Sequence, residues 1–251
     1  MCGIVGYIGD KEKKEVILSG LKELEYRGYD SAGMAVMSDG KIDFFKAVGK
    51  LENLALKTKD FTSTGFGVAI GHTRWATHGK PTEINAHPHL GEHSFVVHNG
   101  IIENYKELKD ELEAKGVKFV SQTDTEVIVH LFEEILKEKK DPFKAYEATI
   151  AKLRGAYATL LITKTAPDKI FFAKDAAPMA IGKSNEKELY FASSDAPLIG
   201  NATEVAYLDD NNYGYVSLDE IAVFKHGKKA SITFNALPKD KSYAQKEGYT
   251  F

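Results

Sequence analysis

The stretch MCGIVGYI, residues 1–8, lies at the beginning of the 251-residue sequence and decides the fold. Ile4, Val5 and Ile8 are β-branched residues, which favour extended backbone, so residues 2–8 are predicted to form a strand. The glycines between them allow another backbone or a ligand to approach the strand closely. A cysteine, Cys2, stands at the start of this strand.

Cys2 is the single cysteine of the chain. Removal of Met1 would give this residue both a thiol and a free α-amine. The reference pKa of an α-amine is about 7.7–8.0 and that of a thiol is about 8.5, so the amine can take the thiol proton near neutral pH. N-terminal amines activate nucleophiles in this way. Cys2 is therefore a candidate nucleophile, and the alternative is a small buried apolar residue.

Composition bounds the class of protein. Hydrophobic residues make up 43% of the chain and charged residues 27%, as is typical of a globular protein. The net charge of −3 gives no electrostatic reason to expect nucleic acid as a partner. No apolar run reaches the about 18–20 residues that span a membrane, and no signal-peptide pattern is visible. A single cysteine fits a reducing compartment, so we expect a cytoplasmic protein that binds neither nucleic acid nor membrane.

Further along, strand patterns outnumber helix patterns and the two do not alternate. This order disfavours a doubly wound parallel sheet and predicts an α+β fold of mainly antiparallel sheets with helices layered outside. Asn99-Gly100 is a strong turn signal, expected to end a strand, and Thr123-Asp124-Thr125-Glu126 matches a capping box. Helices are predicted over residues 11–26, 51–56, 104–115, 123–138 and 143–153; strands over 32–37, 41–48, 66–72, 94–98, 156–162, 169–174, 189–192, 205–208, 213–217 and 221–224.

Polar clusters follow several of these predicted strands, where a rigid scaffold often presents functional residues. The Asn99 side chain and the Gly100 N–H have the chemistry of two oxyanion donors. Arg74 suits a substrate carboxylate and Asp124 a substrate ammonium. Each also has a structural explanation: Asn99-Gly100 as a turn, and Asp124 as a carboxylate near a helix N-terminus. Together with Cys2, the set indicates a cysteine hydrolase acting on an α-amino acid with a side-chain carbonyl.

Five motifs carry a resemblance over nearly the whole chain: MCGIVGY at 1–7, YRGYDSAG at 26–33, HTRWATHG at 72–79, HNGIIENY at 98–105 and TDTE at 123–126. The chain resembles the glutaminase domains of the glucosamine-6-phosphate synthases, which are class II glutamine amidotransferases of the N-terminal-nucleophile hydrolase superfamily. The resemblance implies a four-layer αββα sandwich over residues 1–238. Residues 239–251 would begin a linker to an absent sugar-phosphate isomerase domain.

The resemblance also implies a role for each residue at the reacting centre. Cys2, freed of Met1, would attack the side-chain amide of L-glutamine to give a γ-glutamyl thioester and ammonia, with its own α-amine as the base, directly or through a water. Asn99 Nδ2 and the Gly100 N–H would form the oxyanion hole. Arg27 would lie close to the nucleophile and order the N-terminus.

For substrate binding, the resemblance implies that Arg74 holds the glutamine α-carboxylate, with Thr77 and His78 nearby, and that Asp124 takes the α-ammonium. Trp75 would lie in a loop that closes on glutamine and helps to gate ammonia. No cofactor or metal is implied. L-glutamate would be released, and in the full-length protein, a homodimer, the ammonia would aminate fructose 6-phosphate.

Three alternatives remain open at this stage. The domain could belong to another class II amidotransferase that supplies ammonia to a different acceptor. It could be a non-catalytic module that keeps the fold, which uniform retention of Met1 would favour. His87, His89, His93 and His98 could instead form a metal site, because two histidines separated by one residue in a loop are a possible ligand pair.

Overall fold

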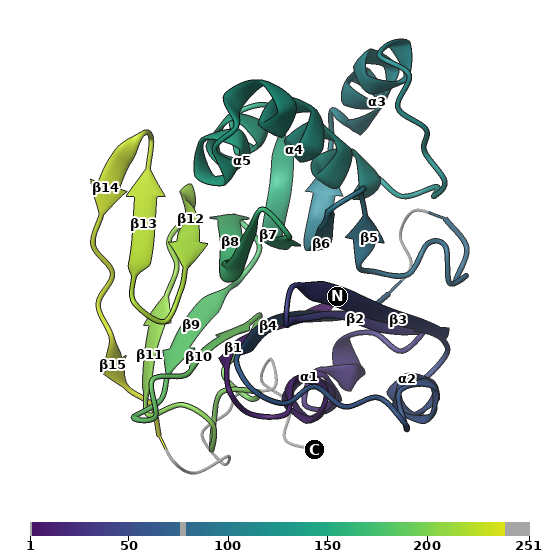
Figure 1. Ribbon diagram of the computed structural model, residues 1–251. Helices are drawn as coiled ribbons and strands as arrows, with labels where there is room; N and C mark the ends of the chain where they lie inside the picture. The colour runs from purple at the N-terminus through teal and green to yellow at the C-terminus, as the bar shows by residue number, and fades with distance from the viewer. Residues whose placement is uncertain (1, 76–78, 239–251) are drawn as a thin grey trace.

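The computed structural model describes residues 2–75 and 79–238. Two β-sheets lie face to face, and helices cover the outer face of each sheet (Figure 1). All paired strands in both sheets are antiparallel. The predicted four-layer α+β sandwich is therefore confirmed.

The first sheet has eight strands in the order β15-β11-β9-β10-β1-β4-β2-β3, so that β1 lies in its middle. The strands span β1 Gly3–Gly9, β2 Ser31–Ser38, β3 Lys41–Val48, β4 Gly67–Arg74, β9 Ala180–Lys183, β10 Leu189–Ala192, β11 Glu204–Tyr207 and β15 Asn235–Ala236. All seven residues of β1 are buried. The strand predicted from residues 2–8 is therefore the centre of this sheet.

The second sheet has seven strands in the order β14-β13-β12-β8-β7-β6-β5. They span β5 His89–Leu90, β6 Ser94–Ile102, β7 Gly155–Thr163, β8 Ala166–Asp175, β12 Asn212–Val216, β13 Ile221–Lys225 and β14 Lys228–Ala230. The helices are α1 Lys13–Lys22, α2 Leu51–Lys57, α3 Tyr105–Ala114, α4 Glu126–Lys139 and α5 Pro142–Ile150. Helices α1 and α2 cover the first sheet, and α3, α4 and α5 cover the second (Figure 1).

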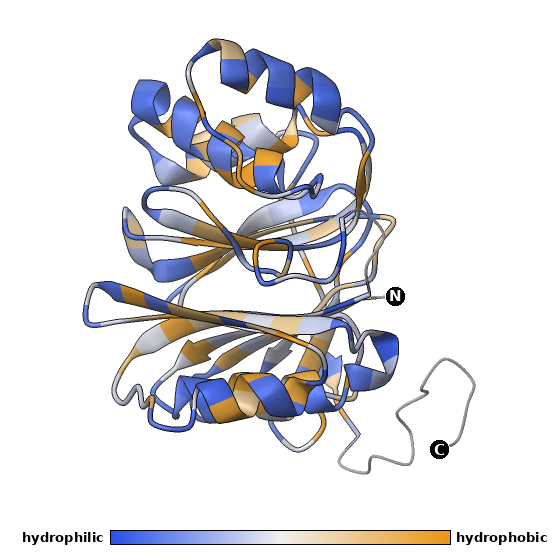
Figure 2. Ribbon diagram, turned by 90° about the vertical axis from the view of Figure 1, so that its right-hand side faces the viewer, coloured by the Kyte–Doolittle hydropathy of each residue, from blue (hydrophilic) through white to orange (hydrophobic). Residues whose placement is uncertain are grey.

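Three apolar clusters hold the layers together. One lies between the sheets and includes Ile4, Val97 and Phe172, whereas two others pack α1 and α2 under the first sheet and α3–α5 over the second. Figure 2 shows hydrophobic residues on the inward sides of the helices and hydrophilic residues on their outer faces. Burial of these apolar faces supplies the main driving force for assembling the sandwich.

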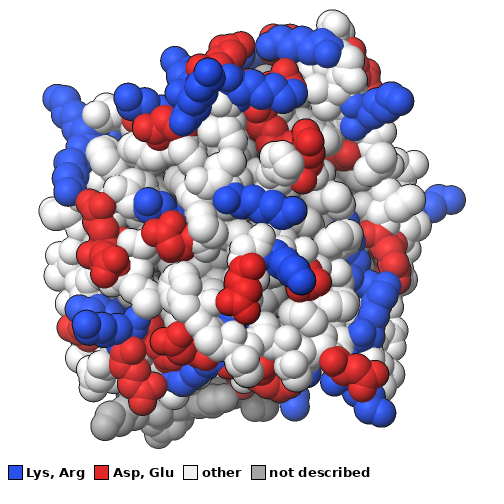
Figure 3. Space-filling model, in the orientation of Figure 1, with Lys and Arg blue, Asp and Glu red and all other residues white. Residues whose placement is uncertain are grey.

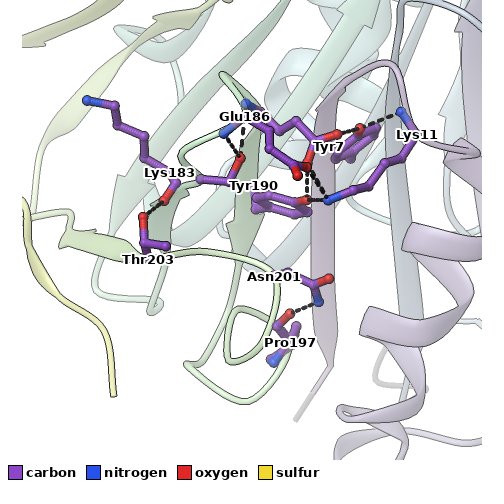
Figure 4. A network of polar contacts seen from close by, with 10 residues as sticks. Tyr7, Lys11, Lys183, Glu186, Tyr190, Pro197, Asn201 and Thr203 are labelled. Atoms are coloured by element: carbon purple, nitrogen blue, oxygen red, sulfur yellow. Dashed lines mark hydrogen bonds and ion pairs between the residues drawn. The ribbon is translucent and has the colours of Figure 1, made fainter. Parts of the chain in front are cut away.

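Polar contacts anchor the end of β1 that lies away from Cys2 (Figure 4). The buried Glu188 carboxylate accepts hydrogen bonds from the hydroxyls of Tyr7 and Tyr190, each at 2.7 Å. Lys11 Nζ lies 2.6 Å from the same carboxylate. Because every acceptor oxygen has a charged or hydroxyl donor, this carboxylate is buried without being left unsatisfied. The network ties β1 to β10.

The surface carries no single dominant charge on the face drawn in Figure 3, where basic and acidic side chains are interspersed. Among the described residues, no helix combines the length and apolar character needed to cross a membrane.

Three sequence expectations are corrected by the structure. Asn99-Gly100 does not end a strand, because β6 continues to Ile102 and both residues pair with β7. The first helix ends at Lys22, not at residue 26, and a short 3₁₀ turn over Glu25–Arg27 follows. The capping box is wrong: α4 begins at Glu126, and the Glu126 carboxylate accepts from the backbone N–H groups of residues 120 and 121 instead.

Candidate active site

Cys2 immediately precedes β1, and β4 pairs with β1 in a register that sets Gly3 opposite Thr73. The end of β4 therefore reaches the thiol: the Trp75 N–H donates to Cys2 Sγ at 3.3 Å. Burial raises the pKa of the Cys2 thiol, and the Trp75 N–H and the nearby Arg74 guanidinium act in the opposite direction. An amine base is consistent with this environment, because burial alone does not favour the thiolate.

The two predicted oxyanion donors lie on β6, in the facing sheet. Asn99 Nδ2 donates to the Cys2 carbonyl oxygen at 3.1 Å, which ties the backbone of Cys2 to the second sheet. A carboxamide nitrogen carries two hydrogens, so one remains for a substrate oxygen. Gly100 has φ of 119°, and a β-carbon added there would lie 1.9 Å from the Ala156 carbonyl oxygen. Only glycine fits this position of the strand.

A pocket beside Cys2 collects most of the predicted residues. It is lined by Cys2, Arg74, Trp75, His87, His98, Gly100, Thr123, Asp124 and Thr125. Arg74 is 4% exposed, and its guanidinium donates to the Gly79 carbonyl at 3.1 Å. Asp124 is 5% exposed, and its carboxylate accepts the Ile102 N–H at 2.7 Å. A cationic and an anionic side chain therefore lie on one pocket with the thiol.

Asn99 is not among the residues that line the pocket, whereas Trp75 is, and the surroundings of Arg27 and Trp75 differ. Arg27 is buried, with its Nε donating to the Tyr26 hydroxyl at 3.1 Å, and it is not among the residues that line the pocket. Its role at the N-terminus stays a prediction. Trp75 is 48% exposed, and its ring meets the Tyr29 ring edge to face. Thr77 and His78 lie outside the described residues.

The backbone of residues 28–30 packs closely against the backbone of Arg74 at the end of β4. Gly28 follows the 3₁₀ turn, and a β-carbon added there would lie 2.6 Å from the Arg74 carbonyl carbon. The Asp30 N–H donates to the Arg74 carbonyl oxygen at 3.2 Å. The motif at residues 26–33 therefore supports the backbone of the pocket at Arg74.

Buried histidines, of which His87 lines the pocket, form a cluster that sequence reasoning did not assign to the site. The rings of His72 and His87 stack at 4.0 Å, and His89 meets His87 edge to face. Burial lowers the pKa of each of these imidazoles, for His72 to about 3, so that they are neutral at physiological pH. Only the position of His72 next to Thr73 and Arg74 could have signalled its involvement.

The metal alternative is not supported. In the ranges 2–75 and 79–238, no group of three or more His, Cys, Asp or Glu side chains is placed to hold a metal ion. The His98 Nδ1 atom is engaged by Thr125 Oγ1 at 2.9 Å. His93 is exposed beside Glu92.

A larger cavity of about 670 Å³ opens elsewhere, lined by Glu147, Tyr157, Tyr213 and His226 among others. It contains no thiol, because the one cysteine of the chain lines the smaller pocket. We therefore assign the candidate active site to the smaller pocket, which contains the thiol.

A comparison with protein-family models identifies the family to which the chain belongs. The family model described as a glutamine amidotransferase domain matches residues 72–200, about half of the chain. The chain belongs to this family. The match includes Arg74, Asn99, Gly100 and Asp124.

Two relatives of the chain carry the same name. The chain is 64% identical over all 251 residues to the glutamine–fructose-6-phosphate aminotransferase [isomerizing] of Campylobacter jejuni, and covers 42% of that protein. It is 55% identical over 219 residues to the protein of the same name from Helicobacter pylori, covering 87% of this chain and 36% of that one. The chain thus spans less than half the length of these curated relatives.

Among solved structures, the glutamine phosphoribosylpyrophosphate amidotransferase from B. subtilis, complexed with ADP and GMP, matches with a TM-score of 0.66. The identity is 26%, and the match covers 86% of this chain and 49% of the other. A protein named as an amidotransferase therefore has a fold similar to that of this chain.

Proposed function

We propose that this domain hydrolyses L-glutamine to L-glutamate and ammonia, with Cys2 as the nucleophile after removal of Met1. The freed α-amine of Cys2 takes the thiol proton, and the sulfur attacks the side-chain amide carbon. The tetrahedral oxyanion accepts hydrogen bonds from Asn99 Nδ2 and the Gly100 N–H. Ammonia leaves with the returned proton, a γ-glutamyl thioester remains, and water hydrolyses it to glutamate and the free thiol.

The observation that carries this proposal is the convergence of four separate segments on one pocket. Cys2 comes from the start of β1, Arg74 from the end of β4, Gly100 from β6 and Asp124 from just before α4. Arg74 binds the α-carboxylate through its planar, doubly donating guanidinium, and Asp124 binds the α-ammonium. An amino acid held at both ends presents its side-chain carbonyl to the thiol, which lowers the entropic cost of attack.

Met1 determines whether the base exists. While Met1 is attached, the Cys2 nitrogen is an amide and cannot accept the thiol proton. Trp75 closes over bound glutamine and limits the escape of ammonia, with Thr77 and His78 completing the α-carboxylate site and Arg27 ordering the freed N-terminus.

The longer relatives support a proposal for the complete protein. Because they are named glutamine–fructose-6-phosphate aminotransferases, the ammonia would aminate fructose 6-phosphate to give glucosamine 6-phosphate. The glutaminase domain would span residues 1–238, with residues 239–251 leading to an isomerase domain. The complete enzyme would act as a cytoplasmic homodimer.

The test is to measure glutamate and ammonia released from glutamine, with the N-terminal mass determined on the same sample. Release in equal amounts by the Met1-free protein, and none by a Cys2→Ala variant, is the expected result. Uniform retention of Met1 together with no release would favour the non-catalytic alternative instead.

A further inference from the structure

His72 makes an unusual pair of contacts between the two sheets. It lies on β4, 1% exposed, and its Nε2 atom is 3.0 Å from the His98 carbonyl oxygen and 3.0 Å from Asn99 Oδ1. Both partners belong to β6, the strand that carries the predicted oxyanion donors. One ring nitrogen therefore faces the backbone and the side chain of that strand at once.

These contacts fix which ring nitrogen carries the hydrogen. A backbone carbonyl oxygen is only an acceptor, so His72 Nε2 has to be the donor. Complete burial keeps the imidazole neutral, with a single N–H. His72 Nδ1 has no hydrogen-bond partner within the described part of the chain, so no contact there requires it to carry a hydrogen.

The same N–H sets the orientation of the Asn99 carboxamide. Its oxygen has to face the His72 donor, so its NH₂ group faces Cys2, where Nδ2 lies 3.1 Å from the carbonyl oxygen. A rotation of the amide by 180° would set NH₂ against the His72 N–H and oxygen against the Cys2 carbonyl oxygen. Both contacts would then be repulsive, and a buried polar group without a partner is costly.

We propose that His72 is a positioning residue that holds the Asn99 carboxamide with its N–H donors toward the reacting centre. This inference rests on the proposed function of Asn99 as an oxyanion donor. The stacked His87 ring, at 4.0 Å and 19° from parallel, fixes the plane of the His72 imidazole. Preorganised donors of this kind need no rearrangement as the oxyanion forms.

The experiment compares His72→Phe, which keeps a stacking ring without the donor, with His72→Gln, which keeps an N–H donor. We expect His72→Phe to lower kcat for glutamine hydrolysis by at least about tenfold, up to the roughly hundred- to thousand-fold loss expected for removal of one oxyanion donor. KM should change by less than about twofold, since His72 does not line the substrate pocket. His72→Gln should recover part of kcat. His93→Phe, at an exposed histidine, is the matched control.

A double-variant comparison separates positioning from a general structural effect. In an Asn99→Ala background, His72→Phe should cause no further loss, because the group it orients is gone. An equal loss in both backgrounds, or a folded His72→Phe protein with kcat within about twofold of the parent, would overturn the proposal. Circular dichroism of each variant verifies folding.

A spectroscopic readout is independent of catalysis. Long-range ¹H–¹⁵N NMR spectra should show His72 protonated on Nε2 alone, without titration between pH 5 and 8, as expected for a fully buried imidazole. Protonation on Nδ1 would overturn the proposed orientation of Asn99. If the unsubstituted protein released no glutamate, the proposed function would fail, and this spectrum would still decide whether His72 orients Asn99.

Discussion

Gly100 pairs with β7 in the second sheet and carries a predicted oxyanion donor, so replacing it by alanine should damage both the fold and the site. An added β-carbon would lie 1.9 Å from the Ala156 carbonyl oxygen, at a backbone φ of 119°. Because the obstacle is backbone of the neighbouring strand and not a flexible side chain, β6 would have to separate locally from β7. That separation also displaces the Gly100 N–H from the reacting centre.

The expected cost follows from two contributions. A non-glycine residue forced into a sparsely populated backbone region costs about 1–3 kcal/mol, and overpacking costs a further about 1–3 kcal/mol. Gly100→Ala should therefore lower the free energy of unfolding by about 2–6 kcal/mol, a large share of the about 5–15 kcal/mol typical of native domains.

Urea denaturation followed by circular dichroism measures this loss. Gly116→Ala is the matched control, because Gly116 also has positive φ, 88°, but an added β-carbon there meets no atom within 4 Å. We expect the control to cost about 1–2 kcal/mol through the backbone alone. A cost of Gly100→Ala no greater than that of Gly116→Ala would show that the close approach of Ala156 does not constrain β6.

Four further predictions concern single side chains. Cys2→Ala should abolish glutamine hydrolysis, since the chain has no other thiol; retained activity would remove Cys2 from the mechanism. Asn99→Ala should raise the barrier by about 2.7–4 kcal/mol, roughly a hundred- to a thousand-fold in kcat, and a loss below about fivefold would leave Asn99 without an oxyanion role. Arg74→Lys should mainly raise the KM for glutamine, because lysine lacks the bidentate fork; an unchanged KM would argue against carboxylate binding. Burial acts to raise the pKa of Glu126, but hydrogen bonds led by that from His130 outweigh it and lower the pKa to about 2. The pKa of a glutamate in the unfolded chain is about 4.3, so this stabilisation is complete above that pH and is lost as pH falls toward 2. The urea midpoint of Glu126→Gln should therefore decline less in acid than that of the parent protein. Parallel declines of the two midpoints would contradict the assignment.

The long elements of the fold could be predicted from the sequence because their signals are local. The hairpin of β2 and β3 has the predicted bounds within one residue on each side, and Asp39 and Gly40 at its turn both have positive φ, as two-residue hairpin turns require. Strands β5, β9, β14 and β15 were missed. Strands β5, β14 and β15 have only two or three residues each, too few for a period to be visible, and each forms along the edge of a longer strand. Strand β9 has four residues and completes its pairing between β10 and β11.

Errors arose where long-range pairing overrode a local preference. Asn99-Gly100 has the composition of a turn, but its pairing with Ala158 and Tyr157 of β7 keeps it in the strand. The candidate site also has features that residue type indicates and features that depend on long-range contacts. The residue types of Cys2 and Arg74 indicated their chemistry, whereas the contact between His72 and Asn99 joins two sheets across 27 positions and leaves no local pattern.

The central place of β1 in its sheet has a consequence for synthesis on the ribosome. The Ile4 N–H donates to Ser193 Oγ, 189 positions later, and β10 flanks β1 in the finished sheet. At about 5–20 residues per second, strand β1 waits roughly 10–40 s for this neighbour during synthesis. Throughout that interval, one edge of β1 lacks its final partner. Under the proposed mechanism, this interval is when an aminopeptidase would reach Met1 most easily, before the two sheets close around Cys2.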